Sequence, residues 1–152
     1  MNRNKSGISP VMATVILVAI AIVIAIAVAF WASGLVGVFT RFEKMEVTTA
    51  MYDTTNRDVE LLVRNTGSSA ATIDNIYVNG QPVSSYTLAT DGDVVHPPIG
   101  AATCDTSGTC DPGEYIVVSI SSPTGGWAHG VTYEFAIHTA SGKTYPVSVL
   151  IP

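Results

Sequence analysis

The chain has 152 residues, of which 47% are hydrophobic and only 12% charged, and its net charge is −5 at pH 7. This length allows one membrane or filament helix and one modest domain. The acidic balance lacks the basic profile of a nucleic-acid module and does not attract a phosphate backbone. No nucleic-acid binding is therefore expected.

A short polar leader, MNRNKSG, opens the chain and carries two basic residues, Arg3 and Lys5. Basic residues before an apolar segment are typical of an N-terminus that stays on the cytoplasmic side of a membrane. A secretory signal would instead place a small-residue cleavage site after its apolar segment, and none of the usual form is present. Loss of the leader would leave five basic and twelve acidic side chains, a net charge of −7.

An uncharged apolar stretch follows, from Ile8 to Phe39. Ser9 can cap the first amides of a helix, and Pro10 suits the first helical position because its missing N–H costs no hydrogen bond. A helix from Pro10 to Phe39 would be roughly 45 Å long, which exceeds the ~20 residues that a bilayer core requires. The excess is absorbed either by tilt in the membrane or by packing against copies of the helix outside it.

Small residues recur at every fourth position of this helix and form one ridge: Ala21, Ala25, Ala29, Ser33 and Gly37. Such a ridge allows another helix backbone to approach closely. The alternative is a simple alanine-rich span, because small residues are common in membrane helices. Helix propensity weakens between Ala32 and Gly37, where a bend or local melting is an open option.

Short β-type runs with turn residues between them begin at Glu46. Asn79-Gly80 is a hairpin turn signal. Apolar and polar residues alternate within several runs, as in a half-buried strand. We predict an antiparallel immunoglobulin-like β-sandwich, so the fold class is α+β. The predicted strands are Val47–Tyr52, Val59–Asn65, Ala71–Val78, Pro82–Leu88, Tyr115–Ser121, Val131–Thr139 and Thr144–Ile151.

The longest interruption of this pattern, Thr90 to Gly113, contains both cysteines, Cys104 and Cys110. In a domain expected outside the cell, two cysteines this close favour a disulfide, which would stabilise the fold by roughly 2 kcal/mol. Zinc would need two further ligands at suitable spacing, and the chain does not present them. No metal site is expected here.

Other candidate chemistry is sparse. The three histidines, His96, His129 and His138, have no nucleophile pattern near them, so surface or core roles are favoured over catalysis. The Asp91-Gly92-Asp93 segment is a turn rather than a calcium loop, because the remaining alternating oxygen ligands are missing. Trp127 either contacts a neighbour or packs onto the end of the sandwich. We expect no enzyme, no catalytic residue and no cofactor.

The residues Lys5-Ser6-Gly7, followed by Ile8-Ser9-Pro10-Val11 and a long uncharged helix, resemble the class III signal peptide of archaeal type IV pilins. The resemblance spans Lys5 to Phe39. It implies that a membrane prepilin peptidase cuts between Gly7 and Ile8 and leaves the helix on the mature protein. The helix would then exchange lipid for neighbouring helices in a filament core, so that little apolar surface meets water.

One departure concerns Met12, which occupies the fifth mature position, where bacterial pilins usually carry an acidic residue. Archaeal members generally lack that acid. Archaellins, the subunits of the rotating archaeal filament, share the leader but tend to have glycine-rich mature starts. The Ile-Ser-Pro-Val start therefore favours a non-rotary pilus.

The resulting prediction divides the chain into a cleaved leader (1–7), a polymerisation or transmembrane helix (8–40) and an extracellular head domain (41–152). The resemblance implies a pilin that resides in the membrane as a precursor and then in an adhesive surface pilus. Its partners would be copies of itself, prepilin peptidase, the assembly machinery, and surfaces or other cells. The alternatives are an archaellin-like motility subunit and a monomeric, membrane-anchored surface binding protein.

Overall fold

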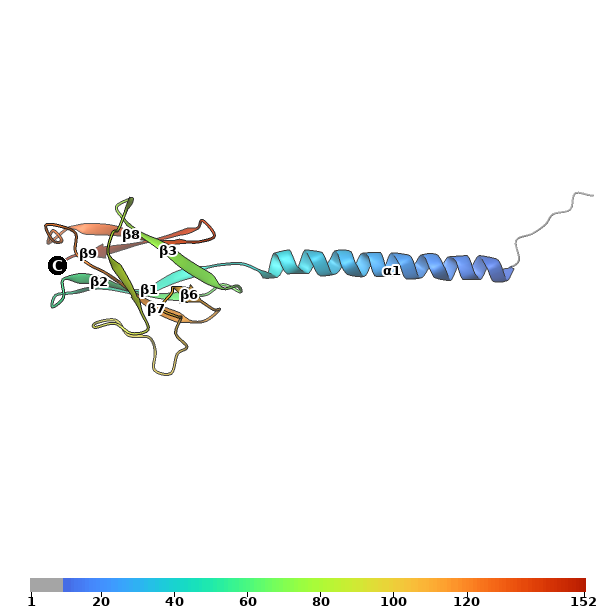
Figure 1. Cartoon of the computed structure of the whole chain (residues 1–152), viewed down its shortest axis with the longest axis horizontal. Coiled ribbons are helices and arrows are strands. Elements are labelled where there is room, and N and C mark those ends of the chain that lie inside the picture. Colours follow the sequence, from blue (N-terminus) through green and yellow to red (C-terminus); the bar gives the residue numbers. More distant parts are fainter. Residues whose placement is uncertain (1–9) are drawn as a thin grey trace, which may run out of the picture. The chain divides into compact units, whose positions relative to one another are not determined.

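The computed structural model describes residues 10–152, except for the side chains of residues 38–40. The described chain forms two compact units, a helical segment that ends at Thr40 and a β-domain from Arg41 to Pro152 (Figure 1). The fold is therefore α+β, with one long apolar helix followed by antiparallel sheets.

Helix α1 spans Pro10–Thr40, 31 residues. It continues through Gly34 and Gly37, so the bend or melting considered for this region is absent. A glycine costs only about 1 kcal/mol relative to alanine inside a helix, and the long run of regular helix before Gly34 tolerates two of them. The hydroxyl of Thr14 donates to the Val11 carbonyl at 2.8 Å, so this polar group is satisfied within the helix.

Two antiparallel sheets make up the β-domain. The first has the order β1-β2-β7-β5, and the second has the order β4-β3-β8-β9, with β6 pairing against β3. The strands of the first sheet are β1 (Met45–Asp53), β2 (Asp58–Asn65), β7 (Tyr115–Ile120) and β5 (Tyr86–Ala89). Those of the second are β4 (Gln81–Pro82), β3 (Ala71–Val78), β8 (Thr132–Thr139), β9 (Thr144–Leu150) and β6 (Thr109–Cys110).

The core lies between the sheets and follows the two-residue period of the strands. In β2, the side chains of Val59, Leu61 and Val63 are fully buried, and they contribute to one cluster with Phe135 and Ile137 of β8. Facing sheets that bury alternate residues in this way define an immunoglobulin-like sandwich.

The hairpin signal at Asn79-Gly80 is confirmed. Both residues have positive φ angles, 49° and 78°, and the flanking residues pair across the turn. This is the backbone of a two-residue type I′ turn, for which Asn-Gly is the preferred sequence. The sequence therefore sets the β3–β4 turn locally.

The single strand predicted over Pro82–Leu88 is wrong. Pro82 ends β4, which pairs with β3, whereas Tyr86 begins β5, which pairs with β7 in the other sheet. The chain crosses between the sheets at residues 83–85. Proline has no N–H for a strand ladder, which is consistent with the end of pairing at this point.

Candidate assembly and binding surfaces

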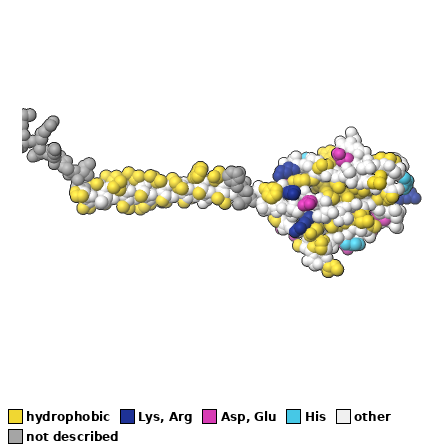
Figure 2. Space-filling model, turned by 180° about the vertical axis from the view of Figure 1, so that it is seen from behind, with side chains coloured by type: hydrophobic (Ala, Val, Ile, Leu, Met, Phe, Trp, Pro, Cys, Tyr) yellow, Lys and Arg dark blue, Asp and Glu magenta, His cyan; other side chains and the backbone are white. Residues whose placement is uncertain are grey.

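Helix α1 exposes its apolar side chains on every side. All side chains that the structure describes from Pro10 to Gly37 are exposed, with exposed fractions of 77% for Phe30 and 70% for Trp31. Figure 2 shows the hydrophobic side chains along the length of this unit. By length and composition the helix could cross a membrane. Because no face is polar, lipid or other helices must cover it.

The small-residue ridge lies on this continuous helix, at Ala21, Ala25, Ala29, Ser33 and Gly37. A Cβ added at Gly34 or Gly37 would meet no atom of the chain within 4 Å. Packing within this chain therefore does not require glycine at either position. Pro10 begins the helix, whereas Gly7, Ile8 and Ser9, named for leader cleavage and helix capping, lie outside the described residues.

The first residues of the β-domain are fixed by hydrogen bonds from the turn between β2 and β3 and from the β8–β9 hairpin. The N–H groups of Thr66 and Gly67 donate to the Lys44 carbonyl at 2.8 and 3.1 Å. The Lys143 ammonium and the Tyr145 hydroxyl donate to the Glu43 carbonyl at 2.8 and 3.3 Å. The segment 42–44 is thus part of the folded domain and not a free linker.

The backbone of residues 42–44 passes especially close to Gly67. A Cβ at this position would lie 2.5 Å from the Phe42 carbonyl oxygen and 2.6 Å from the Lys44 nitrogen. Glycine is therefore required where the turn between β2 and β3 passes over the entering chain. Burial raises the pKa of the nearby Tyr145 hydroxyl above its ordinary value, and the Glu43 carboxylate raises it further.

Cys104 and Cys110 form a disulfide, and both residues are buried. The bridge closes the segment that carries β6, which pairs with the start of β3. The amide of Asn65 donates to the Cys110 carbonyl at 2.8 Å and to the Ser69 carbonyl at 2.9 Å. The disulfide therefore closes part of the long loop on itself, and the Asn65 side chain holds that part to the turn between β2 and β3.

The sequence did not point to Glu60, a glutamate on β2 with only 1% of its surface exposed. Its carboxylate accepts three backbone hydrogen bonds, from Asp93 at 2.8 Å and from Val94 and Val95 at 2.9 Å each. A Cβ at Gly92 would collide with this carboxylate. Glu60 therefore anchors the loop that covers the outer face of the first sheet.

Acidic side chains gather at the β1–β2 hairpin, where Asp53 pairs with Asp58. One carboxylate oxygen of each residue is buried without a hydrogen-bond partner among the described residues. Burial raises the pKa of Asp58, and the nearby carboxylates of Asp53, Glu60 and Asp93 raise it further. The folded state therefore disfavours the charge on Asp58.

All three histidines have polar partners. His96 contacts Asp91 at 2.7 Å and His138 contacts Asp74 at 2.6 Å, while His129 contacts the Pro152 carbonyl. The contact with His96 lowers the pKa of Asp91, and the same contact raises the pKa of His96. Within residues 10–152, no group of three or more His, Cys, Asp or Glu side chains is arranged to hold a metal ion.

Trp127 packs onto the sandwich and is only 7% exposed. Its ring meets those of Tyr133 and Phe135 edge to face, at centroid distances of 5.0 and 5.5 Å. Its indole N–H donates to the Arg57 carbonyl at 3.1 Å. Of the two roles considered for this residue, packing onto the end of the sandwich is the one observed.

The fold is similar to that of an archaeal protein of known structure. No protein-family model and no curated protein matches the chain. The archaellum periplasmic stator protein FlaG from Sulfolobus acidocaldarius is similar, at 18% identity over 71% of this chain and all of that chain, with a TM-score of 0.51. A chain of the FlaF and FlaG stator complex from the same organism matches at 18% identity over 71% of this chain and 90% of its own length, with a TM-score of 0.44. At this identity, the likeness to FlaG establishes the fold alone.

Proposed function

We propose that this protein is a structural subunit of an archaeal type IV pilus. In this proposal residues 1–7 are removed, residues 8–40 pack with copies of themselves in a filament core, and residues 41–152 form the outer domain. The observation that carries the proposal is helix α1, whose described side chains from Pro10 to Gly37 are all exposed and uncharged. Such a surface requires partners along its whole length.

In this proposal, close helix packing must drive the transfer of the helix from lipid to the filament core. Lipid tails are as apolar as the helix, so helix association in the membrane depends on close packing and not on a gain in hydrophobic burial. The small ridge at Ala21, Ala25 and Ala29 provides a surface for such packing. Removal of Arg3 and Lys5 with the leader would take away the charges that hold the helix in the bilayer.

The β-domain supports a load-bearing role in this proposal. Tension along a filament would enter the domain at residues 42–44, which hydrogen bonds hold from both the β2–β3 turn and the β8–β9 hairpin. Several bonds would then share the force, because Glu43 and Lys44 have separate donors. Attachment to surfaces or other cells would be the role of such a filament.

A second candidate function is a membrane-anchored stator-like protein, in which α1 stays in the bilayer. The likeness of fold to the archaellum periplasmic stator protein FlaG favours this candidate. It would keep the β-domain as a monomeric or hetero-oligomeric module outside the membrane. The two functions differ in whether the leader is cut and whether the helix leaves the membrane.

The test is the N-terminus of the protein in sheared filaments, read by mass spectrometry. The pilin proposal expects Ile8 as the first residue in the filament fraction. A Gly7→Leu variant should keep Met1 and stay in the membrane, whereas the matched control Ser6→Ala should be processed and assembled. Wild-type protein found only in membranes, with the leader intact, would contradict the pilin proposal and favour the anchored protein.

A further inference from the structure

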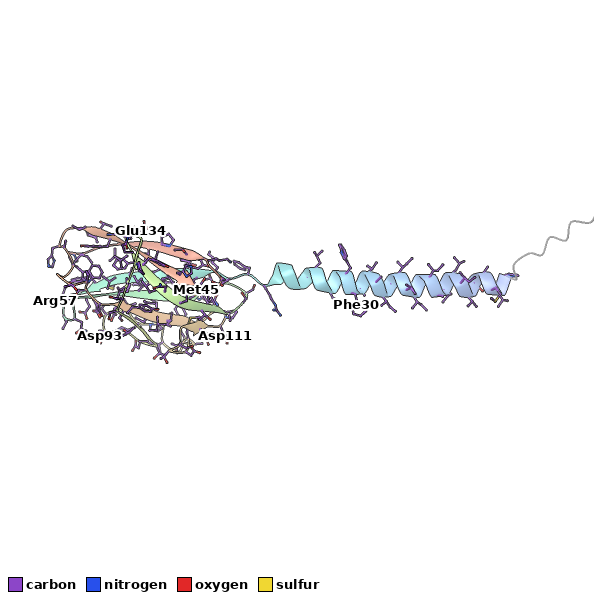
Figure 3. All side chains as sticks on the ribbon, turned by 45° about the horizontal axis from the view of Figure 1, so that its top comes forward. Phe30, Met45, Arg57, Asp93, Asp111 and Glu134 are labelled. Atoms are coloured by element: carbon purple, nitrogen blue, oxygen red, sulfur yellow. A yellow bond between two sulfur atoms is a disulfide. The ribbon has the colours of Figure 1, made fainter. Side chains whose placement is uncertain are left out.

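A cavity of about 540 Å³ lies at the end of the β-domain that carries the β1–β2 hairpin. Its walls include Tyr52 and Arg57 from this hairpin and Gly125, Gly126, Trp127 and His129 from the β7–β8 connection. Figure 3 shows Arg57 at this tip of the domain. Strand β1 separates the tip from the chain entry by nine residues, or roughly 30 Å. The volume is in the range of small-molecule sites, roughly 300–1,000 Å³.

Arg57 has an unusual backbone. Its φ angle is 62°, and Asn79 is the only other non-glycine residue with a positive φ in the described chain. Asparagine tolerates this left-handed region, whereas other side chains cost roughly 1–2 kcal/mol there. Two hydrogen bonds hold the conformation: the Arg57 N–H donates to the Asp53 carbonyl at 2.9 Å, and its own carbonyl accepts from Trp127. Glycine at this position would be less strained.

The folded domain does not use the guanidinium of Arg57. Within residues 10–152 this group forms no hydrogen bond, ion pair or ring contact, and Arg57 is one of the residues that line the cavity. By contrast, Arg64 lies over the Tyr115 ring and Lys143 binds the Glu43 carbonyl. The sequence thus places an arginine at a strained position where its side chain adds no hydrogen bond, ion pair or ring contact among the described residues. Strained residues of this kind occur preferentially at functional sites.

The charged side chains of the cavity suit an anion, because Arg57 lines it and no aspartate or glutamate does so, although Asp53 and Asp58 belong to the same hairpin. Pro152 also lines the cavity, and its carbonyl oxygen is already in contact with His129. The Asp53 carboxylate instead accepts a hydrogen bond from the Thr55 N–H at 2.7 Å. A guanidinium without a partner is suited to bidentate binding of a carboxylate, because its planar donors match the two oxygens.

The remaining walls fit a sugar ring. Trp127 is held rigidly by its indole hydrogen bond and by Tyr133 and Phe135, and Tyr52 adds a second, half-buried ring. Aromatic walls with a few fixed polar groups are typical of ligand pockets. Turns form much of the rim, at residues 54–57 and 125–126, so an extended peptide would find no continuous strand edge there.

We propose that this cavity binds a carboxylate-bearing sugar of an acidic polysaccharide. The Arg57 guanidinium binds the carboxylate, and Tyr52 and Trp127 form the walls against the sugar ring. In the pilus, which is the part that rests on the proposed function, the site would attach the filament to an acidic surface coat. The binding itself depends only on the β-domain and not on assembly.

The experiment measures binding of trigalacturonate to the full-length protein in detergent micelles by isothermal titration calorimetry, with uncharged trigalactose as the matched ligand. We expect wild-type protein to bind trigalacturonate at least about tenfold more tightly than trigalactose, since the charged hydrogen bond supplies the preference. Arg57→Gly should lose this preference while its melting temperature stays equal or rises. Arg57→Lys keeps the charge without the planar donors and should bind with intermediate affinity.

Two results would overturn the proposal: no binding of trigalacturonate by wild-type protein, or equal binding by wild type and Arg57→Gly. If Arg57→Gly lowers the melting temperature, the arginine has a structural role and the argument from strain is wrong. Filament yield separates this proposal from the proposed function. A protein that assembles but does not bind contradicts only the sugar site, and one that binds but never assembles contradicts only the pilin role.

Discussion

The carboxylate of Glu60 accepts a hydrogen bond from the backbone N–H of Val95 at 2.9 Å, although the two residues are 35 positions apart. The side chain of Val95 is buried in a small cluster with Leu62 and Val117 on the same face of the first sheet. A charged anchor and an apolar anchor therefore hold one loop. Each should depend on the other, because loss of the hydrogen bonds exposes the apolar cluster to water.

Replacement of Glu60 by alanine should lower the stability of the β-domain by about 2–4 kcal/mol. Three backbone N–H groups lose their acceptor, and each buried group left unsatisfied costs roughly 1–3 kcal/mol, less what water recovers. The measurement is thermal or denaturant unfolding of the full-length protein, followed by tryptophan fluorescence in a Trp31→Phe background, so that Trp127 is the only tryptophan. Glu60→Gln keeps the shape and one acceptor oxygen, so it should lose less stability than the alanine variant.

Gly92→Ala is an independent check of the same anchor. Its Cβ would collide with the Glu60 carboxylate and would lie 2.7 Å from the Val95 carbonyl oxygen. We expect a loss of stability similar to that of Glu60→Ala, and little further loss when the two changes are combined. Full additivity of the two changes would show that Glu60 and Gly92 do not act through one loop contact.

The elements set by local pattern were predictable, whereas the contacts across the fold were not. Asn79-Gly80 specifies its turn by itself, and the apolar run after Pro10 specifies a helix. Glu60, by contrast, lies between Val59 and Leu61 in a strand whose side chains alternate between two faces. This pattern predicts that Glu60 points away from the core and into water. It does point outward, but a loop more than thirty residues away covers it. The alternation of residues within β2 does not show that a distant loop covers Glu60.

The fate of Pro82–Leu88 illustrates the same limit. Its residues have strand propensity, and the structure does place β4 and β5 there, but in different sheets. Propensity does not determine which partner a strand takes, because pairing depends on the neighbours that the rest of the fold provides. The strained backbone of Arg57 has the same origin, since a hydrogen bond from Trp127, 70 residues away, helps to hold it.

Removal of the disulfide by Cys104→Ser together with Cys110→Ser should lower stability by about 2 kcal/mol, since the bridge closes a short loop in the unfolded chain. The loss should be confined to the β-domain, with helix α1 unchanged by circular dichroism. The melting temperature of the double variant should equal that of reduced wild type. A difference between them would mean that the serines perturb the buried site beyond the loss of the bond.

Asp58→Asn should stabilise the protein at pH 7. Burial raises the pKa of Asp58 above its usual value of 3.8, so the folded state binds this proton more tightly than the unfolded state. The wild-type protein therefore loses stability as the pH rises from the pKa of Asp58 in the unfolded chain through its higher pKa in the folded chain. At neutral pH this loss is complete. The gain should be at most about 1 kcal/mol, because the carboxyl is still partly hydrated.

The pH profile of melting temperature checks this assignment. The gain of the Asp58→Asn variant over wild type should shrink as the pH falls from the folded pKa, which lies above 3.8, towards the unfolded value of 3.8. It should be nearly absent at pH 3, where the wild-type carboxyl is protonated in both states. Asp111→Asn is a suitable control on an exposed residue at the other end of the domain. If Asp58→Asn raises the melting temperature equally at pH 3 and pH 7, the effect comes from packing and not from charge.

Changes at Ala25 test whether the small ridge of α1 is an assembly surface. Ala25→Asp should abolish filaments, because a carboxylate in the middle of an apolar helix costs roughly 2.5–3.5 kcal/mol on insertion scales and has no partner in a core of identical helices. This variant is also expected to insert poorly, so it cannot separate assembly from membrane entry. Ala25→Leu can separate the two effects. Leucine is fully compatible with lipid, but it fills the small-residue ridge where the backbone of a second helix would approach.

The matched control is Ile24→Leu, one position away on a bulky ridge, where the side chain keeps its volume. We expect both leucine variants to accumulate in the membrane at wild-type level, while only Ala25→Leu reduces the sheared filament fraction, by about tenfold or more. A loss of filaments in Ala25→Leu but not in Ile24→Leu is expected if assembly depends on close helix packing. Equal filament yields from the two variants would mean that Ala21, Ala25 and Ala29 reflect only an alanine-rich span, and the stator-like anchor would then become the better proposal.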